Sequence, residues 1–271
     1  MRTAQAALWP LIGLVAVAAI GFVGDGARAG PWTLGAGETA SYLSLEARRA
    51  PARFDAAGQP ASGERYSGAA SLTLERGLLD WATIGLKSES RAVLLDTDGA
   101  NARNAGEASR ELWLRTRLWD EGPYVGSVQI GYAMPGAAPE IDGLELEDGA
   151  HEVETRALLG RGWAYGQAIG WMSAEGALRV RNHDARDQIR LDATIGARPR
   201  AAPRLLALGQ LFSTTAVGGG DRGDYDLVKL GAGVGYEVFD GFTVVAGGIT
   251  EVSSRNVTRG NSATLSLWVR Y

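Results

Sequence analysis

The chain has 271 residues, a formal net charge of −4 at pH 7, 38 glycines and no cysteine. Without cysteine a secreted domain has no disulfide framework, and the mild negative charge argues against a nucleic-acid partner. No long window carries apolar residues at helical spacing, so composition and pattern together predict an all-β chain rich in turns.

The amino-terminal residues predict a secretory signal peptide. Arg2 is followed by a 13-residue apolar run, Leu11–Val23, and by the small residues of Ala27–Ala29. A positive start, an apolar core and a small-residue cleavage site are typical of secreted proteins. We predict a cleavable signal peptide over residues 1–29 and one domain over residues 30–271. A retained membrane anchor is the alternative, but the run is shorter than the roughly 20 apolar residues of a spanning helix.

The rest of the chain contains twelve segments in which apolar and polar residues alternate. Such alternation is typical of strands with one apolar and one polar face, and each segment is long enough for a tilted transmembrane strand of roughly 9–11 residues. The predicted strands are 38–49, 64–77, 80–92, 107–119, 122–134, 149–160, 163–175, 186–198, 203–216, 224–238, 241–254 and 260–271.

The links between these segments alternate between short and long. Outer-membrane barrels have short turns at one end, longer loops at the other, and an even number of antiparallel strands. We therefore predict a 12-stranded antiparallel up-and-down transmembrane β-barrel, with a soluble β-sandwich as the alternative. The short links lie at 77–81, 119–123, 160–163, 198–203 and 239–242.

The eighth predicted strand shows the two faces clearly, because Ile189, Leu191 and Ile195 alternate with Arg190 and Asp192. In a membrane barrel the apolar face contacts lipid and the charged face lines the lumen. The barrel must close, because an open edge would leave unpaired backbone groups in hydrocarbon. Aromatic residues near the strand ends predict girdles at both membrane borders. They are Trp32, Trp81, Trp119, Tyr124, Trp163, Phe239, Phe242 and Tyr271 at the end with short turns, and Tyr66, Tyr132, Phe212 and Tyr225 at the other end.

Two stretches resemble known outer-membrane proteins. The ending ATLSLWVRY, residues 263–271, resembles the carboxyl-terminal assembly signal of Gram-negative outer-membrane β-barrel proteins. The stretch LERGLLDWATIGL, residues 74–86, resembles a hairpin common in outer-membrane transporter and porin-like barrels without an assigned substrate. The resemblance implies a place in the bacterial outer membrane, contact with its lipid and lipopolysaccharide, and insertion by the outer-membrane assembly machinery. The assembly-signal residues are Leu265, Leu267, Val269 and Tyr271.

The predicted lumen is narrow and charged. Twelve strands lie between barrels of about eight strands, which side chains fill, and barrels of about sixteen, which hold a wide channel. About eight residues precede the first strand, so we expect no amino-terminal plug domain, and any plug must be a loop or a charged network. The inward charges either pair and close the wall or line a polar channel. The candidate pore-lining or constriction residues are Arg115, Arg117, Asp142, Glu145, Glu147, Asp148, Glu152, Glu154, Arg156, Arg179, Arg181, Arg190, Lys229 and Glu237.

Two long links have opposite charge. Residues 139–154 are acidic, and residues 177–190 are rich in arginine. We predict that the acidic loop folds toward the mouth of the barrel and faces these arginines as a constriction. A solvated loop and a divalent-cation site are the alternatives, although the spacing does not match an EF-hand. The acidic residues are Asp142, Glu145, Glu147 and Asp148, and the basic ones include Arg179, Arg181, Arg186 and Arg190.

These features predict a narrow porin-like channel for passive or facilitated diffusion of small solutes, with no cofactor and no bound metal. A non-conducting barrel with a structural or export-accessory role is the alternative. An omptin-like hydrolase would need an Asp pair and an Asp–His pair to activate a water. The sequence offers Asp96 with Asp98, and His183 with Asp184, but the Asp-x-His order is absent because position 181 is Arg181. We therefore predict that the chain is not an enzyme.

Overall fold

Twelve β-strands follow one another along the chain, as the alternating sequence predicts. They are seen in a computed structural model that describes residues 30–51, 63–97, 100–137, 141, 146, 149–182, 185–218 and 224–271. The predicted signal peptide lies outside these residues, so its cleavage stays a prediction. The strands are β1 (Thr39–Pro51), β2 (Glu64–Leu79), β3 (Ala82–Thr97), β4 (Ala100–Glu121), β5 (Tyr124–Pro135), β6 (Glu152–Tyr165), β7 (Ala168–Arg181), β8 (Asp187–Pro199), β9 (Leu205–Val217), β10 (Asp226–Phe239), β11 (Phe242–Arg255) and β12 (Asn261–Arg270).

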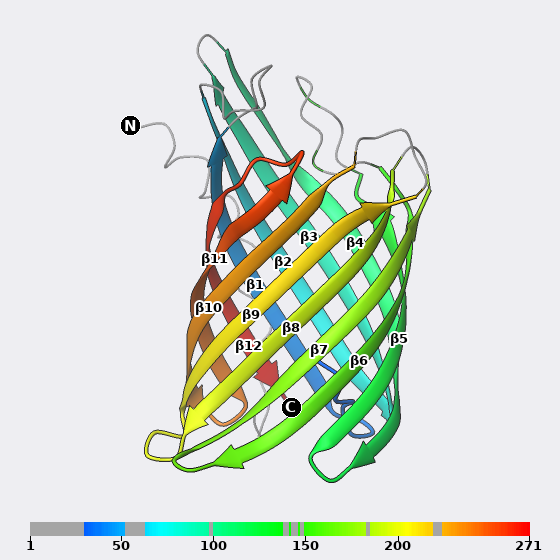
Figure 1. Ribbon diagram of the computed structural model, residues 1–271, viewed down its shortest axis with the longest axis vertical. Helices are drawn as coiled ribbons and strands as arrows, with labels where there is room; N and C mark the ends of the chain where they lie inside the picture. The colour runs from blue at the N-terminus through cyan, green and yellow to red at the C-terminus, as the bar shows by residue number, and fades with distance from the viewer. Residues whose placement is uncertain are drawn as a thin grey trace.

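The sheet closes into a barrel because β1 and β12 pair as antiparallel neighbours. Their register runs from Ala40 opposite Arg270 to Arg49 opposite Asn261. Every other strand pairs with its neighbours in the chain, so the topology is up-and-down, with the strands tilted around the barrel (Figure 1). The carboxyl terminus lies at the end that carries the short turns, here called the turn end (Figure 1). The opposite end, with the longer links, is called the loop end.

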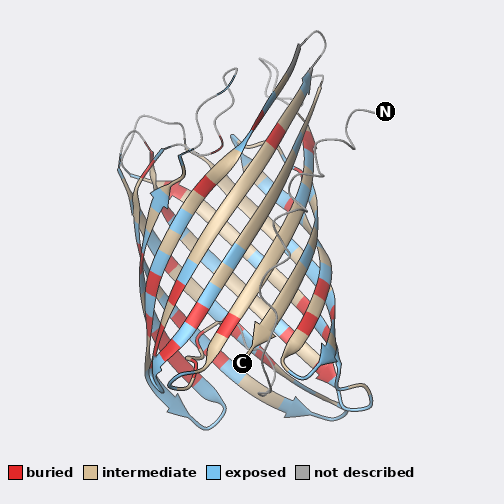
Figure 2. Cartoon of the chain, turned by 180° about the vertical axis from the view of Figure 1, so that it is seen from behind, coloured by how far each residue is buried: buried red, intermediate tan, exposed pale blue. Residues whose placement is uncertain are grey.

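Apolar side chains point outward from the barrel wall, as predicted. Exposed residues alternate with less exposed ones along the strands (Figure 2). On β8, Ile189, Leu191 and Ile195 are exposed, whereas Arg198 of the same strand is buried. Val234 of β10, for example, is 62% exposed. A protein in water would avoid exposing so many large apolar side chains on one surface. Among the described residues no helix is both long and apolar enough to cross a membrane.

The predicted strand bounds are wrong in two places. The short link at 160–163 is part of β6, which continues to Tyr165, so the turn comes just before Ala168. The long link expected between the third and fourth strands is largely strand. Register there runs from Ser90 opposite Glu107 to Thr97 opposite Ala100, so the β3–β4 hairpin projects beyond its neighbours at the loop end (Figure 1).

The aromatic girdle at the turn end is real, but three predicted girdle residues, one at the turn end and two at the loop end, lie inside the barrel. Trp81, Trp119, Tyr124, Phe239 and Tyr271 are exposed near the strand ends. The predictions for three other aromatics are wrong. Trp32 packs inside the lumen, and Phe212 and Tyr225 line an internal cavity. The alternation explains Phe212, because it shares the inward face of β9 with Leu206 and Leu208.

Candidate functional site

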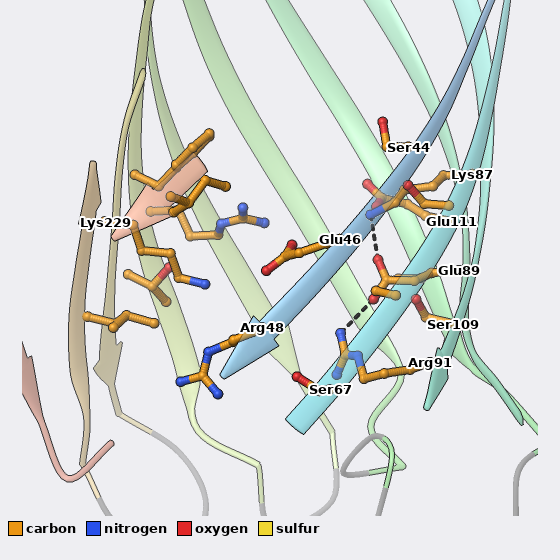
Figure 3. Close-up of a pocket in the computed structure, with 18 of the residues that line it drawn as sticks. Ser44, Glu46, Arg48, Ser67, Lys87, Glu89, Arg91, Ser109, Glu111 and Lys229 are labelled. Atoms are coloured by element: carbon orange, nitrogen blue, oxygen red, sulfur yellow. Dashed lines mark hydrogen bonds and ion pairs between the residues drawn. The ribbon is translucent and has the colours of Figure 1, made fainter. Parts of the chain in front are cut away.

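The loop-end half of the lumen holds a polar cavity of about 910 Å³. Strands of opposite walls contribute to it, and side chains of β1 and β3 point into it (Figure 3). Because period two places every second residue inward, the charged residues of most strands reach this space. The described basic residues that line it are Arg48, Arg65, Lys87, Arg91, Arg179, Arg190 and Lys229, and the acidic ones are Glu46, Glu89, Glu111, Glu152 and Glu251.

Arg156 of β6 holds three carboxylates beside this cavity. Its Nε donates to Glu154 Oε1 at 2.9 Å, and its Nη1 lies 2.6 Å from Glu175 Oε2 and 2.9 Å from Asp192 Oδ2. The side chains of Arg156 and Glu154 are only 11% and 6% exposed. A guanidinium has five donors in a planar fork, so one arginine can serve carboxylates from three neighbouring strands.

Further arginines surround the same carboxylates. Arg179 Nη1 lies 2.6 Å from Glu152 Oε2, and its Nη2 lies 2.9 Å from Glu154 Oε2. Arg181 Nε donates to Glu152 Oε1 at 2.7 Å. Arg190 approaches Glu154 at 3.4 Å. The result is an ion-paired wall with equal numbers of cations and carboxylates, called the β6–β8 cluster. Its members are Glu152, Glu154, Arg156, Glu175, Arg179, Arg181, Arg190 and Asp192.

The predicted constriction stays a prediction, because its acidic residues lie outside the described residues. These are Asp142, Glu145, Glu147 and Asp148. The arginines expected to face them have partners on the strands, and Arg186 pairs with Asp224 at 2.9 Å. One described residue of the acidic loop reaches the mouth of the barrel. Leu146 is buried beside Val93, and its carbonyl accepts a hydrogen bond from Arg91 Nη1 at 3.0 Å.

The remaining candidate residues are spread over the length of the lumen instead of forming one ring. Lys229 lies 3.5 Å from Glu251 at the loop-end cavity. The other candidates lie nearer the turn end. There Glu237 pairs with Arg198 at 2.9 Å, Arg115 with Glu75 at 2.9 Å, and Arg117 with Asp120 at 2.8 Å beside the turn between β4 and β5.

The turn-end half of the lumen is filled by the segment before β1, residues 30–38, called the plug segment. Pro31 is fully buried, and its carbonyl accepts a hydrogen bond from Ser127 Oγ. The Trp32 carbonyl accepts a hydrogen bond from Arg115 Nη1 at 3.3 Å. These donors lie on the inward faces of β4 and β5, so the segment is anchored across the lumen and not along its edge.

Apolar packing holds the same segment. Trp32 packs against an inward-facing group of Trp171, Leu206, Leu208 and Val245, with Trp268 beside it. Inward apolar side chains are unexpected where water fills a lumen, and here they face the plug segment instead. The lower lumen is therefore a small hydrophobic core built around Trp32.

Two inward glycines leave room for the plug segment. A Cβ at Gly77 would lie 2.0 Å from the carbonyl oxygen of Gly35, and a Cβ at Gly160 would lie 2.4 Å from Cγ of Pro31. Contacts under 3.0 Å force something to move, so only glycine fits at either position. The expectation that any plug must be a loop or a charged network is wrong, because nine residues before β1 suffice when the wall is shaped to receive them. Inward glycines next to inward leucines were the sequence signal that could have revealed it.

Polar contacts attach the last part of the plug segment to the barrel rim. Leu34 N donates to Thr83 Oγ1 at 2.8 Å, and Glu38 Oε2 accepts from Gly35 N at 2.9 Å and from Arg270 Nη2 at 2.7 Å. The Arg270 guanidinium and the Gly35 amide lower the pKa of the Glu38 carboxyl. This carboxylate therefore stays ionised, and keeps both partners, down to acid pH.

The residues of the hydrolase alternative are not brought to one described site. Asp98, His183 and Asp184 lie outside the described residues, so the prediction that the chain is not an enzyme stays untested there. His151 Nδ1 lies 2.8 Å from the hydroxyl of Tyr132, and the two rings stack. Among the described residues no group of three or more His, Asp or Glu side chains could hold a metal ion.

Comparison with known proteins supports the fold. No protein-family model matches the chain, and no curated protein sequence does. Among solved structures, an outer-membrane channel of Pseudomonas putida F1 has a TM-score of 0.68 at 11% identity, covering 91% of this chain and 100% of that chain. The NanC porin has a TM-score of 0.54 at 7% identity, covering 84% and 98%. The β-domain of the Bordetella autotransporter BrkA has a TM-score of 0.51 at 14% identity, covering 87% and 99%. The fold is that of bacterial outer-membrane β-barrels.

Proposed function

We propose that the barrel is a gated channel for small polar or amphipathic solutes. The solute enters the polar cavity at the loop end and leaves at the turn end when the plug segment moves aside. The observation that carries this proposal is the contrast between the two halves of the lumen. The upper half has space and charge, and the lower half is closed by nine residues, of which only Gly37 and Glu38 share backbone hydrogen bonds with a strand, at Gly77 of β2.

The barrel does not need the plug segment for closure. β1 begins at Thr39 and pairs with both β2 and β12 without it. Residues 31–34 contact the wall through side chains and a few single hydrogen bonds, none of which belongs to the strand ladders. Segments tied by few bonds open at lower free energy than core strands. A channel built this way can change between closed and open states while the barrel stays folded.

A non-conducting barrel is the second candidate, and the same plug segment together with the ion-paired β6–β8 cluster favours it. In that case the lumen is a structural interior, and the barrel serves the envelope or an export complex. The alternating apolar residues Leu265, Leu267 and Val269 of β12, with Tyr271 directly after the strand, support insertion by the outer-membrane assembly machinery under either candidate.

Planar-bilayer recordings of the refolded domain, residues 30–271, distinguish the two candidates. We expect brief current steps whose size grows with salt concentration, because the polar cavity carries ions whenever the plug segment is displaced. Folding is checked by heat-modifiable migration on gels. Protein that is folded and inserted but silent at every voltage contradicts the channel and leaves the structural role.

A further inference from the structure

One part of the cavity wall is formed by β1, β2 and β3 and, beyond β12, by β11 and β10. This part carries more cations than carboxylates. In the described part of the chain, Lys87 and Arg91 share Glu89, at 2.9 and 2.5 Å. Arg48 and Lys229 share Glu251, at 2.8 and 3.5 Å. Each of these two carboxylates therefore serves two cations. The β6–β8 cluster on the other side has equal numbers of cations and carboxylates, so the positive excess of the cavity lies on this wall.

Arg65 of β2 adds a cation that has no partner among the described residues. It lines the cavity and is partly buried, and none of the described residues forms an ion pair or hydrogen bond with its side chain. The charged side chains that act on it through space are Arg48 and Arg91, and both are cations. A partly buried charge held among like charges is unfavourable unless an anion compensates it.

The register places the three arginines on the inward faces of neighbouring strands. Arg48 of β1 lies opposite Ser67 of β2, and Arg65 is two residues farther along the same inward face. Arg91 of β3 lies opposite Ala69, two residues on the other side of Ser67. Small side chains at 67 and 69 leave the space between the guanidinium groups open. Figure 3 shows Arg48 and Arg91 on either side of Ser67 at the edge of the cavity.

Three further described carboxylates lie near this wall. Glu111 of β4 lies opposite Lys87, and Glu64 of β2 pairs with Arg49. The third is Glu46 of β1, which lines the cavity. Ser262 Oγ donates to Glu46 Oε1 at 2.6 Å, so its side chain is held toward β12 and away from β2. No described carboxylate therefore fills the place beside Arg65.

We propose that Arg65, flanked by Arg48 and Arg91, binds the oxyanion group of an entering solute, a carboxylate or a phosphate. The planar guanidinium fork matches two oxygens of such a group, and charge-assisted hydrogen bonds are stronger than neutral ones. Arg48 and Arg91 keep their carboxylates and contribute mainly their field. The inference deepens the proposed channel, on which it rests for the route of the solute, by assigning it a class of cargo, small organic or inorganic acids.

Binding is tested on the detergent-solubilised domain with inorganic phosphate, followed by phosphorus NMR line broadening, and with succinate as competitor. At low salt, where screening is weak, we expect Arg65→Gln to weaken phosphate binding about tenfold or more, the equivalent of one charge-assisted hydrogen bond. Arg65→Lys keeps the positive charge but loses the planar guanidinium fork. Its phosphate affinity should therefore lie between those of the wild type and Arg65→Gln. The matched control is Arg110→Gln, which removes an exposed arginine that pairs with Glu107 at the loop end.

Equal phosphate binding by the wild type and Arg65→Gln overturns the site. The channel is judged separately by bilayer recordings of the same proteins. If the barrel conducts but neither its anion preference nor its phosphate binding changes when Arg65 is replaced, the channel proposal stands and this inference is wrong. Arg65-dependent phosphate binding in a silent barrel keeps the site and removes the channel.

Discussion

Replacing Trp32 with alanine is expected to raise the frequency of channel openings about a hundredfold. Trp32 is the side chain of the plug segment that packs against the inward Trp171, Leu206, Leu208 and Val245. Truncating a packed tryptophan to alanine costs about 3 kcal/mol or more, and every 1.4 kcal/mol is a factor of ten in an equilibrium. The strand ladders do not involve Trp32, so the loss falls on the docking of the plug segment. Single-channel recordings measure the effect directly.

Trp81→Ala is the matched control for this experiment. Trp81 lies at the same end of the barrel, but its side chain is 51% exposed on the outer surface. The same truncation there should leave the opening frequency of the wild type unchanged. If Trp32→Ala and Trp81→Ala open equally often, Trp32 does not hold the lumen closed.

Replacing Arg156 with methionine should destabilise the barrel by about 3 kcal/mol. Removing one partner of a buried ion pair costs about 3–5 kcal/mol, because the remaining charge is left uncompensated. Glu154 keeps Arg179 and Arg190, and Asp192 keeps Arg190, so their loss is partial. In the described part of the chain Glu175 has no other cation within ion-pair distance, so it bears most of the cost. We therefore expect a value at the lower end of the range. Urea unfolding in lipid vesicles, followed by tryptophan fluorescence, measures it.

Arg255→Met is the control for the Arg156 substitution. Arg255 pairs with Asp226 at 2.7 Å, but the two side chains are 55% and 38% exposed at the loop end. Exposed pairs contribute about 0–1 kcal/mol, so this variant should unfold close to the wild-type urea concentration. An equally small loss for Arg156→Met would mean that the β6–β8 cluster is as well hydrated as the surface, and that its charges are not held in fixed pairs.

The fold could be predicted because lipid imposes a strict pattern on each strand. Where a strand crosses the membrane, as at Ile189 to Ile195 of β8, every outward residue must be apolar, and period two then fixes which charges point inward. The β3–β4 hairpin shows the limit of this reasoning. Beyond the membrane the outward face no longer has to be apolar, so residues such as Asn101 to Asn104 lose the alternation even though they form strand.

The candidate site was predicted only in part, because alternation places a residue inward without naming its partner. Alternation places Arg156 on the inward face of β6, but its contacts with Glu175 and Asp192 depend on the register of three strands, which a single sequence does not reveal. The plug segment was missed for a related reason. Its contacts join Trp32 to residues more than a hundred positions away, such as Trp171 and Val245, and a segment of nine residues has no periodic pattern of its own.

The most direct test of the central claim, that residues 30–38 close the lumen, is a reversible tether. The chain contains no cysteine, so Leu34→Cys with Thr83→Cys introduces one pair. Leu34 N donates to Thr83 Oγ1 at 2.8 Å, so these two positions are in contact, and the disulfide is formed by oxidation before recording. The tether is placed in the Trp32→Ala variant. We expect no current while the disulfide is intact and frequent openings after it is reduced. Openings that are equally frequent while the bond is intact, as verified by mass spectrometry, contradict the account.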